Sequence, residues 1–156
     1  IIESGIENQL FHSRFSAKKK TYLYRIFNRR TRSHLFENRV WFFPVNLNLK
    51  KMKESSELLI GKHNFNAFRS VNCQAKTSIR SINKITIKKK ENIIDIRISG
   101  KSFLHNQVRI IVGTLVNIGK GKWDEKIICD ILKSEDRKLA GPTAPSCGLY
   151  LEKIFY

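Results

Sequence analysis

The segment from residue 102 to residue 119 places the strongest constraint on the fold. Its apolar residues recur at steps of four and three, as on one face of an α-helix: Leu104, Val108, Ile111, Leu115 and Ile118. Ser102 is a good N-terminal cap and Gly119 a good C-terminal stop. A helix with such a continuous apolar face has to bury it against another layer, so the sequence predicts a layered domain.

Alternation with a period of two predicts the other layer. Ile94, Ile96 and Ile98 point to one side of a strand, and Asp95 and Arg97 point to the other. Strands are predicted over residues 21–28, 39–43, 79–88, 93–99 and 148–155. Two shorter helices are predicted over residues 48–60 and from residue 124 onwards, capped by Asn48 and Asp124. The expected fold class is α+β, a mainly antiparallel sheet with helices packed on one face and the other face free to bind a partner.

Charge indicates the class of partner. The 156 residues include 30 Lys or Arg and 13 Asp or Glu, a net charge of +17. An excess of this size favours a polyanion, with nucleic acid first and an anionic membrane surface second. A lysine-rich composition without any partner is the alternative that charge alone leaves open.

Several classes are excluded or disfavoured. No apolar run approaches the roughly 20 residues of a membrane-spanning helix, so we expect no membrane partner. The four histidines lie far apart and the three cysteines form no paired motif, so we expect no metal site and a reducing, cytoplasmic location. No phosphate-binding loop or serine nucleophile motif occurs, and Gly119-Lys120-Gly121 favours a helix exit.

Three polar residues stand out from their local pattern. Arg109 lies within the apolar run of the main helix, where it has to reach solvent or meet a carboxylate or a phosphate. His105 lies one turn earlier on the same segment and is a candidate for the same cleft. Tyr22 follows three lysines, an arrangement that suits base stacking beside phosphate contacts, although the strand pattern alone favours a core tyrosine.

Five motifs in order resemble the tRNA pseudouridine synthase A family. Residues 11–17 are similar to its F-H-A-R-F-S-A segment, with Ser13 in place of Ala, and Tyr22-Leu23-Tyr24 follows like its Y-x-Y strand. Residues 61–69 resemble its G-x-H-D-F-x-x-F-R motif. Residues 103–113 resemble its F-x-H-x-M-V-R-x-I-V-G helix, with Gln107 in place of Met. Residues 143–151 resemble the Thr-Ala-Pro and Gly-Leu-Tyr-Leu segments that close the family pattern.

The resemblance implies an isomerase that converts uridine to pseudouridine in the anticodon stem-loop of tRNA, without a cofactor or metal and as a homodimer. It implies that Tyr22 stacks on the target uracil and that Arg109 pairs with a catalytic aspartate. It further implies substrate contacts, mostly to phosphates, at these positions: Arg14, Lys18, Lys19, Lys20, Arg69 and His105.

One departure from the family is large. Its G-R-T-D motif, which carries the catalytic aspartate, is absent from this sequence. We therefore expect residues 1–156 to be the C-terminal domain of such an enzyme, inactive alone, that holds the substrate while the nucleophile comes from an N-terminal domain. The alternatives are a catalytically inactive RNA-binding module of the same fold and a basic globular protein with no role on RNA.

Overall fold

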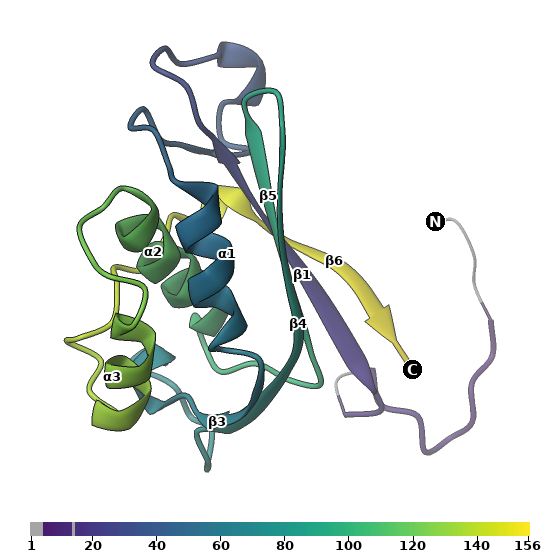
Figure 1. Cartoon of the computed structure of the whole chain (residues 1–156). Helices are drawn as coiled ribbons and strands as arrows, with labels where there is room; N and C mark the ends of the chain where they lie inside the picture. The colour runs from purple at the N-terminus through teal and green to yellow at the C-terminus, as the bar shows by residue number, and fades with distance from the viewer. Residues whose placement is uncertain (1–4, 14) are drawn as a thin grey trace.

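A computed structural model describes residues 5–13 and 15–156 (Figure 1). Its sheet is mixed and runs in the order β2-β1-β5-β4-β3, with β6 paired to β1 on the edge that also takes β2. All neighbours are antiparallel except β1 and β2. The strands are β1 (Lys19–Phe27), β2 (Trp41–Phe42), β3 (Gly61–Asn64), β4 (Ile79–Lys90), β5 (Ile93–Gly100) and β6 (Leu149–Phe155).

The hairpin β4–β5 forms the middle of the sheet, as its alternation predicts. Glu91 takes a positive φ of 53° in the turn between the two strands. Ile98 pairs with Ile85, and Ile96 pairs with Ile87, so these four isoleucines lie on one face. That face is buried, with Ile96 and Ile98 fully inaccessible, and it forms the floor of the core.

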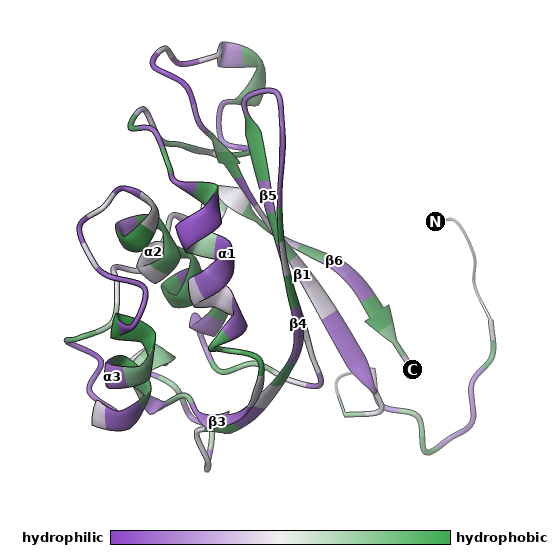
Figure 2. Ribbon diagram, viewed as in Figure 1, coloured by the Kyte–Doolittle hydropathy of each residue, from purple (hydrophilic) through white to green (hydrophobic). Residues whose placement is uncertain are grey.

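Helices α1 (Leu49–Glu57) and α2 (Gln107–Gly119) lie on this face, and α3 (Ile127–Ser134) lies beside the edge formed by β3 (Figure 1). Apolar residues of α2 and the sheet face one another (Figure 2). Every residue of α2 except Arg109 is buried. The sequence pattern predicted one apolar face, but α2 is enclosed on all sides because it is the central element of the core.

The predicted start of α2 at Ser102 is wrong. The helix begins at Gln107, after Asn106 in the left-handed conformation with a φ of 62°. The Gln107 side chain accepts a hydrogen bond from the Leu104 N–H at 2.8 Å, which holds residues 102–106 as a loop. At the other end, Gly121 and not Gly119 takes the positive φ that closes a helix.

Other element boundaries match the sequence more closely. Asn48 caps α1 as predicted, accepting a hydrogen bond from the Lys51 N–H at 3.1 Å, although the helix ends at Glu57 and not near residue 60. The predicted cap of α3 by Asp124 is wrong, because the helix begins at Ile127 after Lys126 and Asp124 instead accepts from the Lys126 N–H at 3.0 Å in the preceding turn. The short strand β3 was not predicted, because it has no alternating apolar residues.

The sheet face opposite the helices is open, as predicted. A shallow hollow on it is lined by Thr21, Lys84, Thr86, Lys88, Arg97 and Ser99. Ion pairs cross this face, with Arg25 at 3.2 Å from Asp95 and Arg97 at 2.9 Å from Glu152. Over the described ranges, no helix is long and apolar enough to span a membrane.

Candidate active site

Two adjoining cavities open where β1 meets the loop before α2. The Tyr22–Arg109 cavity has a volume of about 400 Å³ and is lined by Tyr22, Phe103, Leu104, His105, Asn106, Gln107, Val108, Arg109 and Leu149. The Arg80 cavity has a volume of about 720 Å³ and is lined by Phe15, Lys20, Tyr22, Asn72, Cys73, Gln74, Ala75, Arg80, Ser102, Phe103, Leu104 and His105. Because four residues line both, the two cavities are neighbours in one cleft.

Tyr22 lies on the helix-covered side of β1 and forms part of the wall of both cavities. Its ring packs edge-on against Phe103, with the ring centroids 5.3 Å apart. The side chain is half-buried, and this burial raises the pKa of the hydroxyl, which stays protonated at neutral pH. Tyr22 is therefore both packed on the core and accessible from the cleft, so the two interpretations left open by the sequence are compatible.

Arg109 projects from the first turn of α2 into the same cavity. Its Nε donates to the Ala144 carbonyl at 2.6 Å and its Nη1 donates to Asn106 Oδ1 at 3.1 Å. Within the described part of the chain, no carboxylate lies at ion-pair distance from this guanidinium. Two neutral acceptors thus fix the orientation of Arg109 and leave its positive charge uncompensated in the cleft.

The loop of residues 140–145 holds Arg109 in place. The Ala144 carbonyl accepts the hydrogen bond from Arg109 Nε, and the Ala144 N–H donates to the Arg109 carbonyl at 3.1 Å. Tyr24, whose hydroxyl pKa is raised by burial, donates to the Pro145 carbonyl at 2.6 Å. Gly113 lets the loop approach α2, because an added Cβ there would lie 1.9 Å from the Pro142 carbonyl oxygen.

A second arginine secures the outer side of this loop. Arg137 donates from Nη1 to the Gly141 carbonyl at 2.9 Å and from Nη2 to Thr143 Oγ1 at 3.2 Å. Gly141 also donates its N–H to Thr114 Oγ1 on α2 at 2.9 Å. The loop is therefore bound to α2 and to residue 137, and the sequence pattern did not predict these contacts.

Cys73 marks an electropositive part of the Arg80 cavity. Partial burial raises the pKa of its thiol, but hydrogen bonds from the N–H groups of Ala75 and His105 and the charges of Arg69 and Arg80 outweigh that effect. The net result is a lowered pKa, so the surroundings favour a negative charge at the sulfur position. No local sequence pattern predicts this region, because the contributing residues come from separate segments.

The remaining predicted site residues are spread around the cleft. Lys20 lines the Arg80 cavity, whereas Lys19 lies on the opposite face of β1 with its Nζ 4.0 Å from the Phe155 ring centroid. Lys18 is exposed just before the strand, and Arg69 is half-buried near Cys73 without lining either cavity. Arg14 lies outside the described residues.

The motif of residues 61–69 acts mainly as a packing corner. Phe65 and Phe68 are fully buried, with ring centroids 5.9 Å apart. Asn64 Oδ1 accepts hydrogen bonds from the Ser78 hydroxyl at 2.5 Å and from the Asn66 N–H at 3.1 Å. These contacts fix the turn after β3 and do not place its side chains in the cleft.

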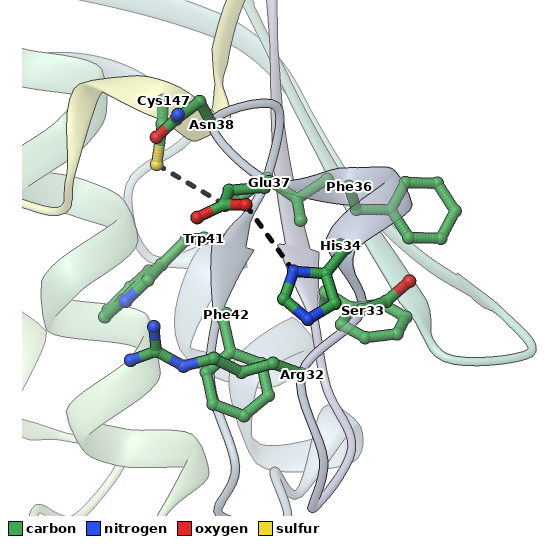
Figure 3. A pocket seen from close by; sticks show the side chains of 11 residues that line it. Arg32, Ser33, His34, Phe36, Glu37, Asn38, Trp41, Phe42 and Cys147 are labelled. Carbon is green, nitrogen blue, oxygen red and sulfur yellow. Dashed lines mark hydrogen bonds and ion pairs between the residues drawn. The ribbon is translucent and has the colours of Figure 1, made fainter.

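A further cavity of about 400 Å³ lies beyond the far end of β1 (Figure 3). The Arg32 guanidinium lies over the Phe42 ring, 5.2 Å from its centroid, and His34 Nδ1 lies 3.7 Å from Glu37 Oε2. Cys147 donates to the Val40 carbonyl at 3.4 Å. None of the predicted site residues lines this cavity.

Among residues 5–13 and 15–156, no group of three His, Cys, Asp or Glu is arranged to hold a metal ion.

Comparisons with known proteins agree on one family. A family model described as tRNA pseudouridine synthase matches residues 56–156. The tRNA pseudouridine synthase A of Neorickettsia sennetsu is 44% identical over all of this chain, which covers 63% of that protein. Those of Anaplasma phagocytophilum and a Thermoanaerobacter species are 45% and 47% identical, with 59% and 64% of their lengths covered.

The chain thus spans about three fifths of the length of the curated relatives that it matches. The matched part includes the segments that form the cleft, from Tyr22 on β1 through Arg109 on α2 to the loop of residues 140–145. The chain belongs to the tRNA pseudouridine synthase family.

Proposed function

We propose that this chain holds the target uridine of a tRNA in the Tyr22–Arg109 cavity while the complete enzyme converts it to pseudouridine. The observation that carries the proposal is that Tyr22 on β1 and Arg109 on α2, distant in sequence, line one cavity. The isomerisation breaks the bond from uracil N1 to the ribose and joins C5 to the ribose in its place. The proton on C5 leaves and N1 gains one, so no co-reactant is needed.

Each side chain has a distinct part in this proposal. The Tyr22 ring supplies a stacking surface for a base extruded from the anticodon stem-loop, which offsets part of the cost of unstacking it. Arg109, oriented by Ala144 and Asn106, pairs with the catalytic aspartate and keeps it ionised. We infer that the aspartate comes from a part of the enzyme outside residues 1–156 and that this chain is the C-terminal, substrate-holding domain.

The test is a fusion protein in which the part of the Neorickettsia relative not covered by this chain is joined to it. Loss of the C5 proton is measured as tritium release from tRNA that carries 5-tritiated uridine. We expect release by the fusion protein and a loss of at least a hundredfold in the Arg109→Ala variant, with tRNA affinity changed far less. The unaltered relative is the positive control. Tight tRNA binding without any release by a folded fusion protein would instead support an inactive RNA-binding module.

We further infer a homodimer in the cytoplasm. Leu35 and Val71 are exposed apolar side chains that an assembly would bury, and all three cysteines are free, which suits a reducing compartment. Sedimentation of the fusion protein tests the first point, and a monomer at micromolar concentration would contradict it. Cell fractionation tests the second, and recovery with membranes would contradict it.

A further inference from the structure

The Arg80 cavity is built to accept an anion. Among the described residues, its lining contains the cationic side chains of Lys20 and Arg80, together with His105, and no carboxylate. At about 720 Å³ it is larger than the neighbouring Tyr22–Arg109 cavity and is large enough for part of a nucleotide. Charge of one sign along the walls of a cleft concentrates the field within it and attracts the opposite charge.

Arg80 provides the most specific sign of a missing partner. Its Nη1 donates to the Thr77 carbonyl at 3.0 Å and to the Ile79 carbonyl at 2.6 Å, which holds the guanidinium at the start of β4. Its Nε is buried and has no hydrogen-bond partner in the part of the chain that the structure describes. A buried donor without an acceptor costs free energy, so an oxygen that reaches Nε would relieve that cost.

The surroundings of Cys73 support the same conclusion. Two backbone N–H groups, from Ala75 and His105, and two arginines favour negative charge at its sulfur. The donors belong to two loops that meet at the cavity, so the electropositive region does not depend on Arg80 alone.

We propose that the Arg80 cavity binds the RNA phosphate adjoining the uridine held at Tyr22, with Arg80 and Lys20 as its cationic ligands. This inference rests on the proposed function, because the proposed function places the target base in the neighbouring Tyr22–Arg109 cavity. A base and its flanking phosphate are covalently linked, and Tyr22, Phe103 and His105 line both cavities. Phosphate contacts fix the register of an RNA, so this one aligns the uridine with Tyr22 and Arg109.

The experiment measures binding of this chain to an anticodon stem-loop RNA by fluorescence anisotropy. Each phosphate near the target uridine is replaced in turn by a neutral methylphosphonate. We expect one replacement next to the uridine to weaken binding about tenfold. In Arg80→Ala, affinity for the unmodified RNA falls about tenfold and that replacement has a much smaller further effect, because only Lys20 remains to contact that phosphate. The log–log salt slope of the variant becomes shallower by about 0.7, the value for one single-strand phosphate.

Matched variants separate the site from general charge. Arg80→Lys keeps the charge but loses the Nε donor, so it should bind with intermediate affinity and an unchanged salt slope. Arg30→Ala removes an exposed arginine outside both cavities and should keep full sensitivity to the replacement. Far-UV circular dichroism establishes that each variant is folded.

The outcomes distinguish this inference from the proposed function. If the chain binds the RNA but Arg80→Ala is as sensitive to every replacement as the original chain, the phosphate site is refuted and RNA binding stands. If inorganic phosphate occupies the cavity with no linkage-specific effect, the cavity is a general anion site and the inference is also refuted. If the chain shows no salt-dependent RNA binding at all, both proposals fail.

Discussion

Replacing Gly113 by Ala tests whether the loop of residues 140–145 positions Arg109. The added Cβ would lie 1.9 Å from the Pro142 carbonyl oxygen, whereas ordinary contacts begin at 3.4 Å. The loop has to move by more than an ångström because the obstacle is backbone. Movement stretches the hydrogen bonds that join it to α2, among them Gly141 N–H to Thr114 Oγ1 and Ala144 N–H to the Arg109 carbonyl.

The magnitude follows from three contributions. Overpacking costs about 2 kcal/mol and two weakened hydrogen bonds about 1 kcal/mol each. Replacing Gly in a helix interior returns about 1 kcal/mol. The free energy of unfolding should therefore fall by about 3 kcal/mol, which at this chain length lowers the Tm by roughly 6–12 °C. In the fusion protein, kcat should fall more than tRNA affinity, because the carbonyl that orients Arg109 moves.

Thermal unfolding followed by circular dichroism is the assay, and Gly119→Ala is the matched control. Gly119 lies on the same helix, but its added Cβ would meet side-chain atoms and no backbone, with Met52 Sδ at 2.7 Å, Met52 Cγ at 2.8 Å and Leu47 Cδ2 at 3.2 Å. These side chains can adjust, so the control should stay within about 1 kcal/mol of the original protein. A Gly113→Ala variant that melts no lower than the control would refute the reasoning.

Three further substitutions and modifications have defined outcomes. Tyr24→Phe should lower the free energy of unfolding by about 1 kcal/mol, because a buried hydroxyl donates to a loop carbonyl; an unchanged urea midpoint would contradict this. Alkylation by iodoacetamide should be fastest at Cys73, because its pKa is lowered and more thiolate is present at each pH. Its rate should reach half of the maximum at a pH below the usual pKa of a cysteine thiol. Peptide mass spectrometry measures this, and faster modification of Cys129 or Cys147 would argue against it. Tyr22→Ala should remove most tritium release by the fusion protein, and unimpaired release by this variant would exclude a stacking role. Tyr22→Phe keeps the ring and removes the hydroxyl, so its rate of release reports whether the hydroxyl contributes to catalysis.

The strands were predictable where one face of the sheet is buried and the other is exposed to solvent. The isoleucines of β5 alternate with charged residues, so both the strand and its buried face could be read from the sequence. Short β3 could not, because its four residues pair with β4 through backbone groups and carry no apolar alternation. The parallel pairing of β1 with β2 could not be predicted from the sequence either, because it depends on how the connection between the two strands folds back.

The start of α2 was mispredicted because a side chain overrides the helical pattern. Gln107 accepts from the Leu104 N–H, and Asn106 adopts a left-handed conformation, which Asn tolerates better than most residues. Residues 102–106 therefore form a loop, and His105 and Phe103 line both cavities as a result. Neither the local pattern nor the capping preference of Ser102 carries this information.

The site was predictable only in part. Tyr22 and Arg109 were singled out from the sequence, and the structure brings them to one cavity. Arg80 and Cys73 were missed as site candidates, because the Arg80 cavity assembles from two strands, two loops and the segment before β1, which have no common motif.

Photocrosslinking locates the target base most directly. An anticodon stem-loop RNA with 4-thiouridine at the target position is irradiated on this chain, and the crosslinked peptides are identified by mass spectrometry. Crosslinks are expected on Tyr22 or within residues 103–109, the lining of the Tyr22–Arg109 cavity. Crosslinks confined to the cavity around Arg32 and Phe42, or to the open face of the sheet, would contradict the central claim that this cavity holds the uridine.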